Sequence, residues 1–461
     1  MFRFLRAVMT SFTEAAPHVP IPKNGVDYRG KIVLAPMVRS GETPSRIVSL
    51  KYGADLVWGP ETVDRAIIGA KRRINPRNSM IEYTRIPSNG GQPNKPAQES
   101  VLYRIDPVRE RGKLIFQLGT ANPSLAVEAA KVVAADVSGI DVNSGCPKPF
   151  STSGGMGAAL LQTPDRLVSI LEALVEEIGK PYEIGISVKI RLLAEPERTE
   201  ALVTRVCRTG ITGLTVHCRT TPMRPREAAI REQLPMIASI CRKAGVACLM
   251  NGDVRSRDEA MKLIREYGVD GAMIATSAES NFSCFRSQAD GGLEHWRDLV
   301  RSYMEAALQC ENRWGNTKYL LNQLVPGKDK AFAESKRSKT YEDCVTVLGF
   351  EDLIPMAKHV DEIIGTAKRA AERAESNKSL AVLKAIEGNT AKAAGGGGIG
   401  KGNSPKLSTQ VNVAGGTGPI RTGSSVSKPT SSASVSAESA VAEVVAKVAD
   451  GTHVPPSPLT V

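Results

Sequence analysis

Eight short runs of apolar and β-branched residues recur along the chain, and helical patterns separate most of them. Turn-forming residues bound the runs, as expected of strands, and the runs are Ile32–Ala35, Ala54–Trp58, Leu114–Gln117, Gly139–Val142, Ile184–Lys189, Gly213–His217, Val246–Met250 and Gly271–Ala275. The helical patterns are Thr43–Tyr52, Pro123–Ala135, Pro164–Ile178, Glu197–Thr209, Arg231–Lys243 and Ser256–Tyr267. Such alternation over about 250 residues is typical of a (β/α)8 barrel. An open doubly wound sheet is the alternative, but no GxGxxG sequence follows the first run, so we predict an α/β fold with a TIM barrel.

The chain of 461 residues is longer than this barrel, and its composition shows where further parts begin. From about residue 376 onward it consists mainly of Gly, Ser, Ala, Thr and Pro, so it cannot bury enough apolar surface to offset the entropy of ordering. Helical patterns at Leu293–Leu324 and Tyr341–Ala374 precede this segment. We predict an N-terminal extension over 1–30, a catalytic barrel over 31–290, a C-terminal helical domain over 291–375 and a disordered tail over 376–461.

The formal net charge of +12 indicates a polyanionic partner such as nucleic acid or an anionic membrane surface. No apolar stretch reaches the roughly 18 to 20 residues of a membrane span. Eight cysteines and five histidines are scattered without a CxxC pair, so we expect neither disulfides nor a metal site, and a reducing compartment. We expect a cytoplasmic monomer. Because Met1–Met9 is basic and amphipathic, a mitochondrial location is the alternative.

Polar or reactive residues follow nearly every predicted strand, at the end where the active site of this fold is built. They are Pro36, Met37, Glu61, Gln117, Asn143, Cys146, Lys189, Arg191, His217, Arg219, Asn251, Gly252, Asp253, Ala275, Thr276 and Ser277. Each alone has an ordinary structural explanation, such as a turn, a solvated strand end or a buried histidine. Their convergence from separate strands favours a catalytic site.

Cys146 lies between Gly145 and Pro147, which cannot continue a paired strand, so it is predicted on the loop just after one. A thiol there can act as a nucleophile or a proton donor, with Asn143 as an orienting amide. The alternative is a small buried apolar residue, because free cysteine is among the most buried residue types.

The residues at the strand ends narrow the chemistry. A metal hydrolase would need more histidines than this barrel offers. A Schiff-base aldolase could use Lys189, and a phosphate-binding isomerase could use the last two loops, but neither explains Cys146 together with Gln117 and Asn251. Amides around one lysine suit a flat heterocycle with imide edges such as flavin, because the lysine would stabilise its anionic reduced form. The last loops would then hold the flavin phosphate, and Cys146 would be the acid.

Several motifs together resemble the tRNA-dihydrouridine synthase family, in the family's order, over about Lys31 to Phe285. They are Leu34–Arg39, Asp141–Lys148, Ser153–Leu160, Val188–Arg191, Val216–Arg219 and Met250–Asp253. The run Cys146–Thr152 leading into Gly154–Gly157, with Leu34–Arg39, is most similar to the eukaryotic branch that modifies the uridine at position 20 of the tRNA D-loop.

The resemblance implies a role for each site residue. Pro36 and Met37 would contact FMN through their backbone, Gln117 would hold the isoalloxazine edge, and Lys189 and His217 would flank flavin and substrate. Further FMN contacts, near the ribityl phosphate, would come from Asn251, Gly252, Asp253, Ala275 and Thr276, where Thr276 stands in place of the family's usual arginine. NADPH (or NADH) would reduce FMN, which would give hydride to C6 of uracil while Cys146 gives a proton to C5. Asn143 would orient the base, and the other substrate contacts would be Glu61, Lys148, Arg191 and Arg219.

Binding of tRNA would require the target base to leave its stack, with affinity supplied mainly by phosphate contacts. The candidate cations are Arg72, Arg73, Arg77, Lys148, Arg191, Arg219 and Arg224. For those in the Lys71–Arg111 insertion, a solvated charge is an equally good interpretation. The helical domain would cradle tRNA or merely cover the barrel. Competing functions are a flavin-dependent reductase or dehydrogenase of a free pyrimidine and a tRNA-binding protein without catalysis.

Overall fold

Eight parallel strands close into a barrel in the computed structural model, which describes residues 19–86, 99–372 and 375. The strands are β1 (Ile32–Leu34), β2 (Leu56–Trp58), β7 (Leu114–Gly119), β8 (Gly139–Ser144), β9 (Gly185–Leu192), β10 (Gly213–Thr220), β11 (Ala247–Asn251) and β12 (Gly271–Ile274). Each pairs with its neighbours, and the pairing of β2 with β7 closes the ring. The short strand β3 (Thr62–Val63) extends the sheet beside β7. The predicted TIM barrel is therefore confirmed. Residues 1–18 of the predicted N-terminal extension and the predicted tail over 376–461 lie outside the described residues.

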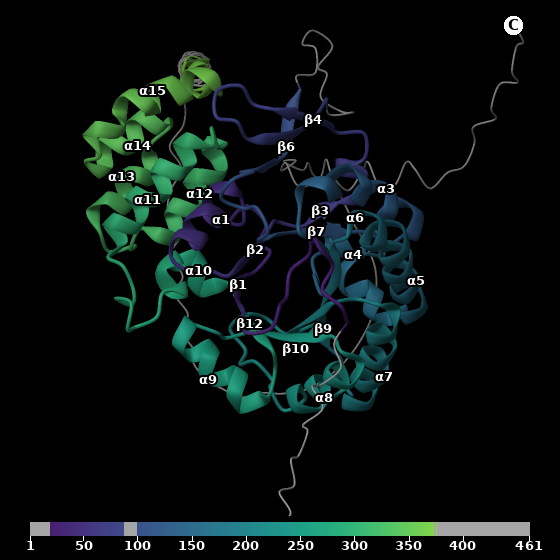
Figure 1. Cartoon of the computed structure of the whole chain (residues 1–461). Helices are drawn as coiled ribbons and strands as arrows, with labels where there is room; N and C mark the ends of the chain where they lie inside the picture. The colour runs from purple at the N-terminus through teal and green to yellow at the C-terminus, as the bar shows by residue number, and fades with distance from the viewer. Residues whose placement is uncertain (1–18, 87–98, 373–374, 376–461) are drawn as a thin grey trace, which may run out of the picture. The chain divides into compact units, whose positions relative to one another are not determined.

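The helices that follow the strands form the outer layer of the barrel (Figure 1). The long ones are α1 (Thr43–Lys51), α3 (Pro123–Val133), α5 (Pro164–Leu174), α7 (Pro196–Val206), α8 (Leu234–Ala244) and α9 (Arg257–Tyr267). The short ones are α2 (Asp64–Ile67), α4 (Pro149–Thr152), α6 (Lys180–Tyr182) and α10 (Thr276–Ser280). Local chemistry sets their ends: the Asn122 side chain accepts from the backbone N–H of Leu125 at 3.0 Å to begin α3. Gly245, at a φ of 74°, ends α8.

The interior of the barrel is filled by side chains rather than open. Val33, Leu56, Trp58, Ile115 and Met273 are buried in one cluster from four different strands, and Val33 lies opposite Leu56 in register. Burial of such side chains contributes about 25 cal/mol per Å² of apolar surface. This apolar packing from several strands lines the barrel interior, which is therefore a packed core rather than a pore.

A three-stranded antiparallel sheet is inserted between β3 and β7. It consists of β4 (Lys71–Ile74), β5 (Ile81–Arg85) and β6 (Ser100–Ile105). Sequence analysis predicts no strands here, because β4 is exposed along its whole length and carries three cations in four residues. The side chains of β5, by contrast, are largely buried.

The helical region after the barrel contains α11 (Trp296–Gln309), α12 (Trp314–Leu324), α13 (Lys330–Arg337), α14 (Tyr341–Leu348) and α15 (Ile354–Ile363), which gather on one side of the barrel (Figure 1). The prediction of one continuous helix over Leu293–Leu324 is wrong, because the chain forms α11 and α12 there and breaks at Glu311, whose φ is 48°. The predicted helix over Tyr341–Ala374 breaks at Gly349, with a φ of 73°. In both cases the apolar spacing continues across a left-handed residue, so the pattern alone does not show the break.

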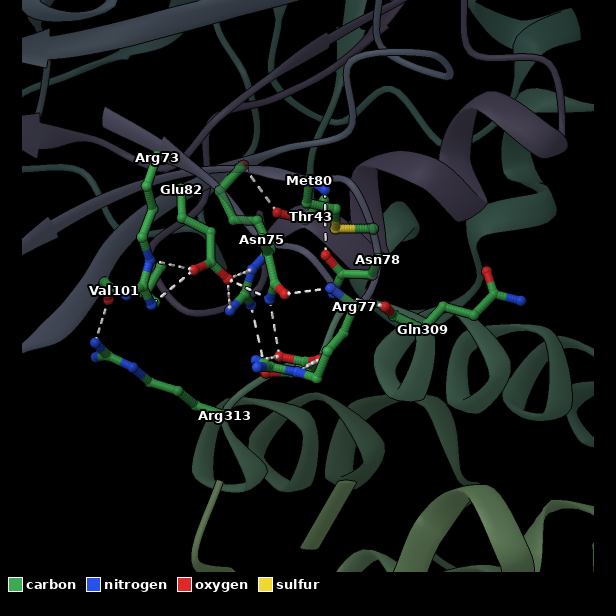
Figure 2. A network of polar contacts seen from close by, with 12 residues as sticks. Thr43, Arg73, Asn75, Arg77, Asn78, Met80, Glu82, Val101, Gln309 and Arg313 are labelled. Atoms are coloured by element: carbon green, nitrogen blue, oxygen red, sulfur yellow. Dashed lines mark hydrogen bonds and ion pairs between the residues drawn. The ribbon is translucent and has the colours of Figure 1, made fainter. Parts of the chain in front are cut away.

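A polar network joins the inserted sheet to the start of the helical region (Figure 2). Arg77 donates to both carboxylate oxygens of Glu311, at 2.5 and 2.6 Å, and Asn75 donates to one of them at 3.0 Å. Asn75 also donates to Glu82 at 3.1 Å, and Arg104 donates to Glu82 through two nitrogens at 2.7 and 2.9 Å. Glu82 and Glu311 are both buried. The inserted sheet therefore positions the helical region against the barrel.

Candidate active site

The polar side chains of four neighbouring strands face the inside of the barrel at its carboxyl end. Side chains two residues apart share a face of a strand, so Lys189 and Arg191 point the same way on β9, as do His217 and Arg219 on β10. The strand register places Asn143 opposite Lys189, and His217 opposite both Arg191 and Asn251. The structure therefore brings these predicted site residues together from separate strands.

A buried carboxylate, Asp141, lies one step deeper in the barrel. It accepts from Nε2 of Gln117 and from Oγ of Ser187, both at 2.8 Å. Burial raises the pKa of Asp141 to about 6, against the opposing effect of these hydrogen bonds and of the Lys189 charge. Gln117 is thereby fixed by its amide nitrogen, which leaves its carbonyl oxygen for a ligand. Sequence analysis assigns no role to Asp141 or Ser187.

Lys189 and His217 carry strongly shifted pKa values. Burial, followed by the nearby Arg191 charge, lowers the pKa of Lys189 to about 8. Burial, followed by the Lys189 charge, lowers the pKa of His217 to about 2. The site at neutral pH therefore holds a lysine that is still mostly charged beside a neutral imidazole.

The loop that carries Cys146 is fixed on two sides. Oδ1 of Asn143 accepts from the backbone N–H groups of Gly145 at 3.1 Å and Cys146 at 3.2 Å. From the next strand, Nε of Arg191 donates to the carbonyl of Gly145 at 2.8 Å. Asn143, predicted to orient the substrate base, thus holds the loop with its amide oxygen.

Cys146 differs from the other cysteines of the chain. All eight lie in the described residues, and seven are buried, whereas Cys146 is partly exposed. Its surroundings therefore do not match the alternative of a small buried apolar residue. Partial burial raises the pKa of the Cys146 thiol, which keeps the group protonated at neutral pH. This state suits a proton donor better than a nucleophile, which must be a thiolate.

Glu61 and Ser151 lie against the Cys146 loop. Burial raises the pKa of Glu61, and the hydroxyl of Ser151, on α4, donates to Glu61 at 3.4 Å. Ser151 also acts on Cys146, because its hydroxyl opposes the effect of burial on the pKa of the thiol. Ser151 is buried and is missed by sequence analysis, because a serine near a turn has many ordinary uses.

Two arginines predicted to bind substrate are engaged within the chain instead. Arg191 donates to the carbonyls of Gly145 and Thr220. Arg219 pairs with Asp253 at 2.6 Å and donates to two backbone carbonyls of the following loop. Both side chains are buried. They shape the rim of the site, and their charges act on it at a distance.

Arg72, Arg73 and Arg77 of the inserted sheet are likewise engaged by carboxylates of the chain. Arg72 pairs with Asp136 at 2.7 Å, Arg73 with Glu82 at 3.0 Å and Arg77 with Glu311 at 2.5 Å. Their side chains are about half exposed, but each already has an anionic partner. Their charges therefore contribute to the fold and are not fully available to a phosphate.

The loop after β11 approaches the site closely. Gly252 has a φ of 116°, and a Cβ atom there would lie 3.4 Å from the His217 ring and 3.3 Å from Ala229, so a glycine suits this place. Asn251 is buried and donates to the carbonyl of Met273 at 2.9 Å. Asp253, at a φ of 50°, is tied to Arg219.

The remaining predicted site residues lie around the mouth. Pro36 and Met37 are partly buried in the loop after β1, and Ala275 is partly buried after β12. Thr276 begins the short helix α10 and is exposed, as is Lys148 beside Cys146. No group of three or more His, Cys, Asp or Glu that could hold a metal ion occurs in the part of the chain that the structure describes. In the same residues, no helix has the length and apolar character needed to cross a bilayer.

The donor set fits a flavin. A partly buried lysine, a neutral imidazole and amides anchored by Asp141 and Met273 surround one end of the barrel, and such groups match the imide edge and anionic reduced form of an isoalloxazine ring. Gly252 keeps the backbone close to His217, at a φ of 116° that side chains rarely adopt. The exposed Thr276 offers a hydroxyl but no charge to a phosphate.

Comparison with known proteins agrees with this chemistry. The profile of the family described as dihydrouridine synthase (Dus) matches residues 33–343. A Schizosaccharomyces pombe protein named tRNA-dihydrouridine(20) synthase is 47% identical over 362 residues, 77% of this chain and 71% of that protein. The Saccharomyces cerevisiae protein of the same name is 44% identical over 330 residues, which are 70% of this chain and 84% of that protein. A human protein named tRNA-dihydrouridine(20a/20b) synthase-like is 28% identical over 298 residues, which are 65% of this chain and 84% of that protein. This chain belongs to the dihydrouridine synthase family.

Proposed function

We propose that this chain is an FMN-dependent tRNA-dihydrouridine synthase that reduces the uridine at position 20 of the D-loop, with NADPH or NADH as the source of electrons. The assignment to position 20 is supported by the two yeast relatives named for that position, at 47% and 44% identity. The human relative named for positions 20a and 20b is only 28% identical. The choice of FMN is supported by the lysine, imidazole and amide groups of the site.

The chain's own residues would bind and tune the flavin. The Lys189 ammonium would stabilise the negative charge of the reduced ring, and the free carbonyl oxygen of Gln117 would accept from an N–H of its edge. The backbone N–H groups of Gly252 and Asp253, with those of the loop after β12, would hold the ribityl phosphate. When bound and reduced, FMN supplies the hydride that adds to C6 of uracil.

Cys146 completes the reaction. Reduction of the C5–C6 double bond needs one hydride at C6 and one proton at C5, and the protonated thiol gives that proton and becomes a thiolate. The observation that carries the proposal is the partial exposure of Cys146 alone among eight cysteines, on a loop fixed beside Lys189 and His217. Water returns the proton to the thiolate after the product leaves.

The substrate would be tRNA with its target base flipped out of the stack. The net charge of +12 supports a polyanionic substrate. Lys148, two residues after Cys146, is exposed and would contact a phosphate near the flipped nucleotide. The protein would act as a monomer.

Modification of tRNA transcripts tests this function. The purified protein with FMN and NADPH is incubated with an unmodified tRNA, with the same tRNA carrying cytidine at position 20, and with free uridine. We expect dihydrouridine at position 20 of the first substrate only. Product from free uridine alone would instead indicate a pyrimidine reductase. A colourless protein that binds tRNA but takes up no FMN would contradict both enzyme functions.

A further inference from the structure

Arg39 presents a cation at the mouth of the barrel. It lies in the loop between β1 and α1, which is at the carboxyl end of the barrel, as is the Cys146 loop after β8. Its side chain is exposed. Its guanidinium carbon lies 4.5 Å from the centroid of the Tyr319 ring, a cation–π contact. Among the described residues, no carboxylate forms an ion pair with Arg39.

The loop holds Arg39 in an unusual conformation. Its φ is 70°, in the left-handed region that residues other than glycine seldom adopt. The backbone N–H of Gly41 donates to the carbonyl of Met37 at 2.7 Å, and Nη1 of Arg46 donates to the carbonyl of Gly41 at 3.0 Å. Ser40 hydrogen-bonds to Glu279 of α10. These contacts enforce the turn, and such enforced conformations concentrate at functional sites.

Tyr319 brings the helical region to the same place. It is a partly exposed residue of α12, which packs against α10. Near the start of α12, Asn316 donates to Glu42 of the β1–α1 loop at 3.0 Å. The ring is therefore fixed against the loop by an independent contact, and it limits the positions that the Arg39 guanidinium can take.

Three other candidate cations of the barrel mouth and the inserted sheet are used differently. Arg191 and Arg219 are buried and donate to backbone carbonyls, and Arg77 is paired with Glu311. Arg39 keeps its N–H groups free of such partners. A guanidinium that stacks on an aromatic ring keeps these donors in its own plane, where they can contact two phosphate oxygens at once.

We propose that Arg39, held in place by Tyr319, binds a backbone phosphate of the tRNA next to the flipped uridine. This rests on the proposed function, because the partner is the polyanionic chain whose base enters the barrel mouth. The contact would position the flipped nucleotide and would use both the barrel and the helical region, since one supplies the cation and the other its support.

The salt dependence of tRNA binding tests this proposal. The dissociation constant of the FMN-loaded protein for unmodified tRNA is measured between 50 and 300 mM salt for the wild type and for Arg39→Ala, Arg39→Lys and Tyr319→Leu. One phosphate contact contributes roughly 0.7 to 0.9 to the slope of log K against log salt concentration. We expect Arg39→Ala to bind several-fold more weakly with a slope smaller by about that amount, and Arg39→Lys to keep the slope.

Tyr319→Leu distinguishes the effect of the Tyr319 ring, which supports Arg39, from the effect of the Arg39 charge. It leaves the Arg39 cation in place, so we expect weaker binding with an unchanged slope. Lys243→Ala removes one exposed cation from the last turn of α8, at the opposite end of the barrel, and we expect it to bind like the wild type. The melting temperature of each variant shows whether its fold is intact.

Two outcomes would overturn the proposal. The first is an Arg39→Ala variant that binds with the wild-type slope, even if it melts at a lower temperature, because the residue would then only tie the loop to α12. The second is an equal loss of slope in Lys243→Ala. A wild-type protein that neither binds nor modifies tRNA would instead overturn the proposed function, so the two failures are distinguishable.

Discussion

Nε2 of His217 lies 3.3 Å from Nη1 of Arg219. A guanidinium can only donate, so Nε2 must accept and the imidazole proton sits on Nδ1. Lys189, Arg191 and Arg219 all face this ring with positive charge, and burial disfavours the imidazolium further. His217 is therefore a neutral residue of the site that can donate one hydrogen bond and cannot serve as its acid.

The pH dependence of turnover tests the state of His217. Because its pKa is lowered to about 2, we expect kcat to show no inflection from this residue between pH 5.5 and 7.5. The measurement is kcat on unmodified tRNA across this range for the wild type and His217→Asn. An inflection near pH 6.5 that disappears in the variant would show that the imidazole titrates in the active enzyme.

Lys189 predicts an alkaline limit to activity. Its pKa is lowered to about 8, so its charge is present below that pH and is lost as the pH rises. We expect kcat to fall above about pH 8 in the wild type, and the fall to move to higher pH in Lys189→Arg. Removal of the charge in Lys189→Ala is expected to slow turnover by about 100-fold. If kcat of the wild type stays constant from pH 7 to 10, the charge of Lys189 does not contribute to the reaction.

Asn143→Ala tests the support of the Cys146 loop. Two hydrogen bonds to the loop are lost, each worth about 1 kcal/mol, so we expect a large fall in kcat with a modest loss of stability. Asn122→Ala is the matched control, because it removes the cap of α3 and about 1 kcal/mol far from the site. Equal kcat in the two variants would mean that the loop does not need Asn143.

The contact between Arg77 and Glu311 predicts a pH-dependent stability. The hydrogen bonds from Arg77 and Asn75 oppose the effect of burial and lower the pKa of Glu311. The ionised Glu311 carboxylate therefore stabilises the folded protein above pH 4.5, and this stabilisation is lost as the pH falls below that value. We expect Arg77→Ala to destabilise the protein by about 1 to 2 kcal/mol at pH 7, measured by urea unfolding, and by less at pH 4. A pH-independent difference would exclude Glu311 as the cause, and Lys180→Ala, in an exposed pair with Glu176, should change little.

The barrel could be predicted from sequence because its strands are short β-branched runs with turn residues at both ends. The inserted sheet could not, because β4 has a single apolar residue and no alternation. The helical break at Glu311 is not marked by a glycine or proline at that position. Glu311 is instead bound by Asn75 and Arg77, which lie more than 200 positions away beside β4 of the inserted sheet.

The site, too, could be predicted from sequence only in part. The rule that strand ends supply the active site finds Lys189, His217 and Asn143, because it depends only on topology. It does not separate ligand contacts from structural ones, since Arg191 and Arg219 bind backbone carbonyls of loops whose path the sequence does not reveal. Asp141 and Ser151 are missed because their roles depend on burial.

The role of Cys146 as the proton donor is tested most directly by a single turnover. Protein carrying reduced flavin is mixed with unmodified tRNA, and dihydrouridine at position 20 is followed with time for the wild type and Cys146→Ala. We predict that the variant keeps its flavin and binds tRNA but forms dihydrouridine at least about 100-fold more slowly, as expected for loss of a general acid. Equal rates for the two proteins would contradict the assignment of Cys146 as the acid.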